Sequence, residues 1–195
     1  MNTPVDVPHI RNITVSGRIG SGQTTLANGL AEKLGWELLE GGALFEKIHN
    51  ELKLTEIQVG DRPDDLDLQY EEKVKNILKN DSHMIIQSHL AGFDAQGIEG
   101  VFKILLICEE DGADKPEIRI DRLVNRKGIS VDEAKKEVIE RETANLVKWR
   151  RLYSPDNSEW VNWDSKYYDL VINTYRNNQE AALGLALDGI KYQSS

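Results

Sequence analysis

Residues 10–25 read IRNITVSGRIGSGQTT, and this stretch gives the strongest indication of the fold class. Ile10–Ser16 is a short, mainly apolar run of the kind that forms a buried strand, and it leads directly into a glycine-rich loop. A helix is expected over Thr24–Leu34, because leucine recurs every four residues on one face and Gly35 ends the pattern. In a strand–loop–helix of this kind, the N–H groups of the loop and of the first helical turn converge on a phosphate.

The glycine loop has the spacing G-x4-G-x-[ST] of a P-loop, and Thr24 stands where that motif places its magnesium-binding hydroxyl. Glycines let the backbone approach an anion without interference from Cβ atoms. We therefore expect this loop to bind the phosphates of ATP, with Mg2+ on Thr24. The expected ATP-binding residues are Gly17, Arg18, Ile19, Gly20, Ser21, Gly22, Gln23, Thr24 and Thr25.

Two other interpretations of the loop stay open. It could be a tight turn that only joins a strand to a helix. It could also be a dinucleotide-binding loop, although its glycine spacing is not G-x-G-x-x-G. Position 23 is unusual for a P-loop, because Gln23 stands where the motif has a lysine on the β- and γ-phosphates. If a phosphoryl group is transferred, cations from elsewhere in the chain must supply this charge.

The rest of the chain alternates strands and helices. Further strands are expected at Trp36–Leu39, His83–Gln87, Val101–Cys108 and Tyr168–Asn173. Helices are expected at Ala43–Leu54, Asp64–Leu78, Asp114–Lys127, Ser130–Leu152 and Asn178–Tyr192, and Ser130 with Glu133 forms a capping box. Five short strands separated by helices predict an α/β protein with a parallel sheet covered on both faces, which is a three-layer sandwich.

Composition narrows the class of protein. The 195 residues carry a net charge of −9, which argues against a protein that coats nucleic acid. No apolar run has the length of a membrane span, and the first nine residues lack the pattern of a signal peptide, so we expect a cytoplasmic protein without a membrane partner. A single cysteine excludes a disulfide framework. Residues 115–151, with eleven basic and seven acidic side chains, suggest that an anion is bound there.

Four segments, in order along the chain, resemble the cytidylate kinases, in particular their short archaeal-type branch. They are ITVSGRIGSGQTTLANGLAEKLGWELLEGGALFEKI at 13–48, IIQSHLAGF at 85–93, RIDRLVNRKGISVDEAKKEVIERE at 119–142 and YYDLVINT at 167–174. The resemblance implies a P-loop nucleoside-monophosphate kinase formed by one domain, 1–195. It also implies a monophosphate-binding insert at about 40–80, a helical lid at about 115–153, and transfer of the ATP γ-phosphoryl group to CMP or dCMP. Its expected partners are small nucleotides. The protein itself is expected to be a monomer or a dimer.

The lid is expected to carry the catalytic cations. Arg119, Arg122 and Arg126 lie at i, i+3 and i+7 on one predicted helix, and they match the family pattern, as does Arg141. Lys148 stands where the family has a lid arginine before an aromatic residue. The alternative is a solvated helical hairpin held by pairs such as Glu137–Arg141.

The acceptor side departs from the family at two places. Glu46 stands where the family has arginine, with Lys47 next to it, and the segment Gln87-Ser88-His89 stands where the family has Glu-Gly-Arg. The expected acceptor-binding residues are Lys47, Asp65 with its neighbour Asp67, and His89. In the alternative interpretations, Lys47 is a surface lysine, the aspartates stabilise a helix N-terminus, and His89 is structural.

Three functions are compatible with these residues. The first is a nucleoside-monophosphate kinase acting on CMP or dCMP. The second is a kinase-shaped nucleotide-binding module that has lost transfer, as the uncharged or acidic residues Gln23, Glu46 and Gln87 suggest. The third is a related small-molecule kinase with another acceptor. Apparent insertions lie near Glu109–Asp114 and Ser154–Lys166, and the second contains Trp160 and Trp163, which we interpret as a packing patch or a partner contact.

Overall fold

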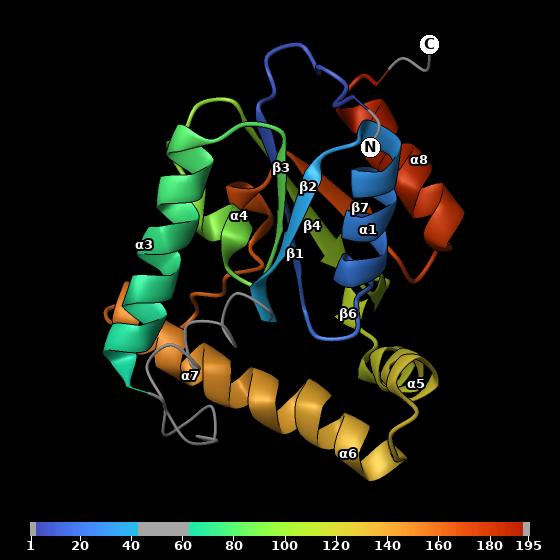
Figure 1. The fold of residues 1–195 in the computed structure, drawn as a ribbon. Helices are drawn as coiled ribbons and strands as arrows, with labels where there is room; N and C mark the ends of the chain where they lie inside the picture. The colour runs from blue at the N-terminus through green and yellow to red at the C-terminus, as the bar shows by residue number, and fades with distance from the viewer. Residues whose placement is uncertain (1–2, 43–62, 193–195) are drawn as a thin grey trace.

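The computed structural model describes residues 3–42 and 63–192 (Figure 1). Its centre is a five-stranded sheet in the order β2-β3-β1-β4-β7, in which every neighbouring pair is parallel. The strands are β1 (Asn12–Gly17), β2 (Glu37–Glu40), β3 (Met84–Gln87), β4 (Val101–Ile107) and β7 (Leu170–Asn173). The predicted α/β class and the five parallel strands are thereby confirmed.

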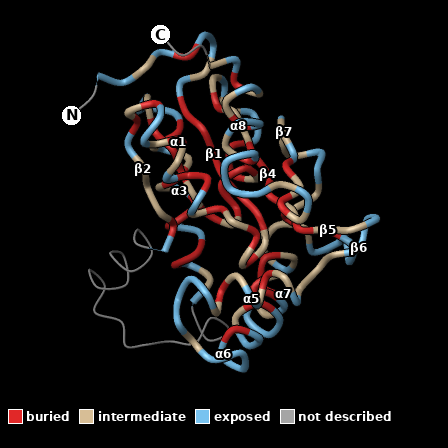
Figure 2. Tube along the Cα trace, turned by 90° about the vertical axis from the view of Figure 1, so that its right-hand side faces the viewer, coloured by how far each residue is buried: buried red, intermediate tan, exposed pale blue. Residues whose placement is uncertain are grey.

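Helices cover both faces of the sheet (Figure 1). On one face, α1 (Gln23–Leu34) and α8 (Gln179–Gly189) pack on the sheet through a core that includes Leu30 and Ala186. On the other face, α3 (Asp64–Asn80) and the short α4 (Ala91–Asp94) form a second core around Val74. Figure 2 shows β1 buried along its whole length between these layers.

Helices α5 (Pro116–Lys127) and α7 (Glu142–Tyr153) lie beyond the carboxyl ends of the strands (Figure 1). Helix α7 continues α6 (Val131–Lys135) through a π-helical stretch, η2 (Lys136–Arg141). The capping box at Ser130 is confirmed, because the Ser130 hydroxyl accepts from the N–H of Glu133 at 3.2 Å. The single α-helix predicted from Ser130 to Leu152 is wrong in one respect, since a wide turn interrupts it.

The remaining elements are short. Strands β5 (Glu109–Glu110) and β6 (Ala113–Asp114) form an antiparallel hairpin in the first apparent insertion, and the 3-10 turn η3 (Ser165–Tyr167) precedes β7. The predicted helix Ala43–Leu54 lies outside the described residues. Within the parts of the chain that the structure describes, no helix combines the length and the apolarity that crossing a membrane requires.

Candidate active site

The glycine loop joins β1 to α1 at the carboxyl end of the sheet. Gly20 has φ +81°, and a Cβ atom there would lie 2.5 Å from the carbonyl oxygen of Arg119, so only glycine fits. Gly22 has φ +104° and stands at the N-cap of α1. No side chain caps this helix, and its first turn holds no acid, so its N–H groups are available to an anion.

Two cavities meet at this loop. The first, of about 530 Å3, lies between the loop, α5 and the connection from β7 to α8. The second, of about 540 Å3, lies between the loop, the end of β2, α3, the segment after β3 and the helices η2 and α7. Both are lined by Gly20, Gly22, Leu123 and Arg126. Ligands bound in the two cavities would therefore contact the same part of the glycine loop.

Gln23 is turned back into the loop. Its side chain is buried, and its Nε2 atom donates to the carbonyl oxygen of Gly17 at 2.5 Å, with His89 Nδ1 at 3.4 Å. Gln23 lines the second cavity. The position at which a P-loop has its lysine is therefore occupied by an uncharged side chain that stabilises the loop.

His89 also holds Gly17. Its Nδ1 atom lies 2.8 Å from the Gly17 carbonyl oxygen, which can only accept, so we assign the ring proton to Nδ1 and leave Nε2 as an acceptor. Burial lowers the pKa of His89, and the ring lies against Trp149 with centroids 6.1 Å apart. His89 lines the second cavity, as expected of a residue that binds the acceptor. With its lowered pKa, the imidazole ring is neutral near pH 7.

Two arginines lie where the transferring group would be. Arg126 lines both cavities, and its Nη1 atom donates to the Thr24 hydroxyl at 3.2 Å. Arg141 lines the second cavity and pairs with Glu137 at 2.6 Å. Both guanidinium groups belong to exposed residues, so they can reorient toward a phosphate at little cost.

The other α5 arginines have different surroundings. Arg122 lines the first cavity and donates to the hydroxyl of Thr174 at 2.9 Å and to its carbonyl oxygen at 2.7 Å. Arg119 is 1% exposed and lines neither cavity. Its guanidinium is paired with Asp114 and Glu142. The three arginines predicted to share one face therefore have different surroundings: Arg119 belongs to a buried ion-pair network, Arg122 lines the first cavity, and Arg126 lines both cavities. The contacts of Arg119 favour a positioning role over direct contact with a phosphate.

Lys148 faces α3. Its Nζ atom lies 2.6 Å from Asp67 and 3.7 Å from Asp64, and the side chain is buried. Asp67 lines the second cavity, one helical turn before Glu71, which also lines it. Asp65 is exposed in the first turn of α3. This position agrees with the alternative interpretation, in which the aspartate stabilises the N-terminus of a helix. Lys47 and Glu46 lie outside the described residues.

Sequence reasoning missed several residues of the second cavity. Tyr70 and Glu71 lie on the α3 face that also carries Asp67, and Asn145 and Trp149 lie one turn apart on α7. Their spacing of three to four residues was the available signal. It could not be used without knowing that α3 and α7 border the same space.

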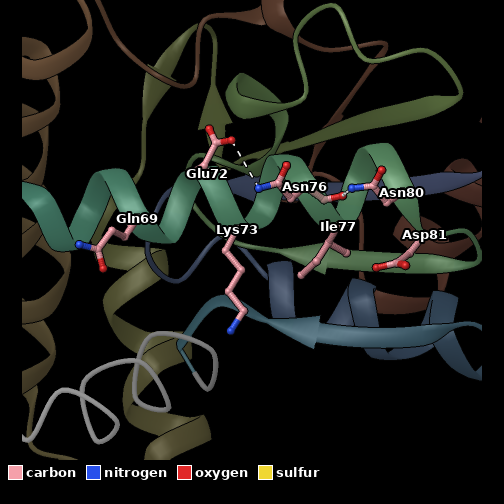
Figure 3. A pocket seen from close by; sticks show the side chains of 7 residues that line it. All are labelled: Gln69, Glu72, Lys73, Asn76, Ile77, Asn80 and Asp81. Carbon is pink, nitrogen blue, oxygen red and sulfur yellow. Dashed lines mark hydrogen bonds between the residues drawn. The ribbon is translucent and has the colours of Figure 1, made fainter.

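A further hollow, of about 430 Å3, lies along the outer face of α3, away from the glycine loop (Figure 3). Two of its side chains donate hydrogen bonds along the helix: Asn76 to Glu72 at 3.4 Å, and Asn80 to the Asn76 carbonyl at 2.9 Å. It shares no residue with the two cavities at the loop, so it takes no part in the candidate active site.

Comparison with known proteins identifies the family. The sequence model of the cytidylate kinase-like family matches residues 12–176. The chain belongs to this family. It is 33% identical to a cytidylate kinase of Natronomonas pharaonis over 168 residues, which cover 84% of this chain and 81% of that protein. It is also 33% identical to a cytidylate kinase of Methanosarcina mazei over 178 residues, covering 89% and 92%. The resemblance stated from the four segments is confirmed.

Solved structures confirm the fold of this cytidylate kinase-like chain. A shikimate kinase from Acinetobacter baumannii superimposes with a TM-score of 0.53 at 19% identity, covering 92% of this chain and 90% of that one. At this identity the likeness concerns the fold alone, a P-loop kinase sandwich. The family and the relatives make the chain a phosphotransferase.

Proposed function

We propose that the protein transfers the γ-phosphoryl group of ATP to a nucleoside monophosphate, with CMP or dCMP as the acceptor. The observation that carries this proposal is the meeting of two cavities at Gly20, Gly22 and Arg126. Phosphoryl transfer needs a donor and an acceptor aligned on either side of the moving group, and it needs cations around that group. The family relationship supports the same reaction.

The first cavity suits the donor nucleoside. Its phosphates would lie along Gly17–Thr25, where the uncapped N-terminus of α1 offers N–H groups without an opposing acid. Amide side chains of Asn177 and Gln179 line the far end and can form hydrogen bonds to a nucleobase. Arg122 would keep the end of β7 against this cavity through Thr174.

Thr24 would hold a Mg2+ ion, which supplies positive charge to the phosphate oxygens when bound. The other ligands would be phosphate oxygens and water, because Mg2+ usually keeps several waters and binds through substrate phosphates. The Thr24 hydroxyl already accepts a hydrogen bond from Arg126, and the lone pairs of this oxygen suit a cation.

Arg126 and Arg141 would supply the charge that Gln23 does not. Both line the second cavity, and forked guanidinium donors stabilise the charge on the equatorial oxygens of the transferring group. Lys148 would act indirectly, by holding Asp67 in place. His89, with its proton held on Nδ1 by the Gly17 carbonyl, would accept a hydrogen bond from the acceptor nucleotide through Nε2. Lys47 remains a proposed contact to the acceptor phosphate.

The second cavity suits a base that carries an amino group. Its α3 side presents the carboxyl groups of Asp67 and Glu71 beside Tyr70. Carboxylates accept hydrogen bonds, and cytosine offers an amino group where uracil offers a carbonyl oxygen. This difference favours CMP or dCMP over UMP.

One incubation tests the proposal. The protein is mixed with Mg-ATP and an equimolar set of CMP, dCMP, UMP, AMP and GMP, and the diphosphates are measured by mass spectrometry. Cytidine diphosphates should form first. Formation of another diphosphate first would support the phosphoryl transfer but would show that the acceptor is a different nucleotide. No diphosphate, with ATP still bound, would instead favour a binding module or an acceptor outside this set.

A further inference from the structure

Charged side chains connect the glycine loop to strand β6 and to helices α5 and α7. We call Arg18, Asp114, Arg119 and Glu142 the loop clamp. Arg18 bonds to Glu142 through Nε at 2.9 Å and to Asp114 through Nη1 at 3.0 Å. Arg119 bonds to the same two carboxylates, at 3.0 and 2.7 Å. Each carboxylate is therefore shared by two arginines, one from the loop and one from α5.

The clamp holds the loop backbone as well as its side chains. The Glu142 carboxylate accepts from the N–H of Ile19 at 3.1 Å, and Arg119 donates to the carbonyl of Ile19 at 2.7 Å. The Ile19 side chain packs with Leu123 and Val138, from α5 and η2. Both backbone groups of the residue that precedes Gly20 are thus fixed by charges outside the loop.

The second apparent insertion covers the clamp. The Trp163 ring lies over the Arg18 guanidinium, whose Cζ atom is 4.6 Å from the ring centroid. Its neighbour Asn162 donates to the carbonyl of His89 at 2.8 Å and accepts from the Tyr168 hydroxyl at 2.6 Å. Residues 162–163 therefore contact the loop and the residue that supports it.

We propose that Glu142 is a positioning residue for phosphoryl transfer, acting through Arg18 and the backbone of Ile19. It holds the loop at the point where the two cavities meet, and it holds α7 so that Arg141, the preceding residue, faces the second cavity. Consecutive helical residues point about 100° apart, so Arg141 and Glu142 face two different sides of the site. The kinetic part of this inference rests on the proposed function.

Amide hydrogen exchange of the ligand-free protein tests the clamp directly. Glu142→Gln keeps the shape and one acceptor oxygen but removes the charge that the two arginines share. We expect the amides of the 17–25 loop to exchange about tenfold faster, which corresponds to about 1.4 kcal/mol. Glu140→Gln is the matched control, because Glu140 is exposed on the same helix. Unchanged exchange in Glu142→Gln would overturn the proposal.

The second readout separates positioning from simple support. At a temperature where Glu142→Gln remains folded, we expect kcat/KM to fall at least tenfold while the affinity for Mg-ATP falls less. Faster exchange with unchanged kcat/KM would also overturn the proposal. Amide exchange is measured without nucleotide. If no diphosphate forms with the set of nucleoside monophosphates, that result counts against the proposed function, and the exchange rates still test the loop clamp.

A milder variant keeps the inference testable if Glu142→Gln does not fold. Arg18→Lys retains the charge but loses the planar guanidinium fork, which bonds the two carboxylates through separate nitrogens and lies on Trp163. It should raise loop exchange in the same direction, by about threefold or more. Trp163→Phe, which keeps an aromatic face, should have a smaller effect than Trp163→Leu. Equal, wild-type exchange in Arg18→Lys and Trp163→Leu would contradict the role of the clamp.

Discussion

Replacing Arg119 by methionine should lower the free energy of unfolding without removing a catalytic group. Arg119 is 1% exposed, and its guanidinium forms ion pairs with Asp114 and Glu142 and donates to the Ile19 carbonyl. Breaking a buried ion pair by removing one partner costs about 3–5 kcal/mol. Arg18 still faces both carboxylates in the variant, so we expect the lower end, about 3 kcal/mol.

Urea unfolding followed by fluorescence and circular dichroism measures this loss. Arg141→Met is the control, because Arg141 is 43% exposed and has one surface pair, worth about 0.3–0.5 kcal/mol. A structural role for Arg119 would be contradicted if Arg119→Met loses less than about 1 kcal/mol of stability and nevertheless loses most of its turnover. That result would make Arg119 a catalytic cation, as the sequence alone suggested.

Three further predictions concern the site. Arg141→Gln should lower turnover about 100-fold or more with little change in ATP affinity, whereas Lys136→Gln on the exposed side of the same helix should behave as wild type. Gly20→Ala should abolish ATP binding, measured by calorimetry, because its Cβ would lie 2.5 Å from the Arg119 carbonyl at a φ of +81°. Between pH 8 and 5.5, wild type should lose more thermal stability than His89→Gln, because burial lowers the pKa of His89.

The sign of the last effect follows from proton binding. The unfolded chain, with a histidine pKa of about 6.5, takes up the proton before the folded chain does, so the contribution of neutral His89 is present above that pH and is lost as the pH falls. Parallel pH curves for the two proteins would contradict it. Turnover of Arg141→Gln within threefold of wild type would refute its role at the transferring group, and ATP binding by Gly20→Ala would refute the close packing of the loop.

The fold was predictable because its signals are local. Apolar runs such as Val101–Cys108 mark strands, and the capping box at Ser130 marks a helix start that the structure confirms. The glycine loop between Ile10–Ser16 and Thr24–Leu34 indicated where a phosphate would bind. These features depend on neighbouring residues, so one sequence is enough to recognise them.

The partners of the site residues were not predictable, because they come from distant segments. Arg119, Arg122 and Arg126 share one face of α5, yet Arg119 is paired with Glu142, from another helix, and Arg122 with Thr174, at the end of β7. Lys148 is likewise paired with Asp67 on α3. Long side chains on one face can reach different partners, and helical spacing alone does not tell which.

The second insertion was only partly understood from the sequence. Trp160 is buried against Phe93, with ring centroids 5.2 Å apart, which confirms the interpretation as a packing residue. Trp163, three residues later, lies instead on Arg18 of the glycine loop. A spacing of three residues suggested one common environment, but residues 160–163 do not form a helix in the structure.

The proposed reaction requires two nucleotides to bind at once, in the two cavities that share the glycine loop. A bisubstrate compound, in which adenosine and cytidine are linked 5′ to 5′ through a polyphosphate, tests it by isothermal titration calorimetry. We predict one molecule bound per chain, with a dissociation constant at least about 100-fold below those of ATP and CMP alone. Affinity no better than that of ATP would contradict this requirement, and so would binding that leaves CMP able to bind independently.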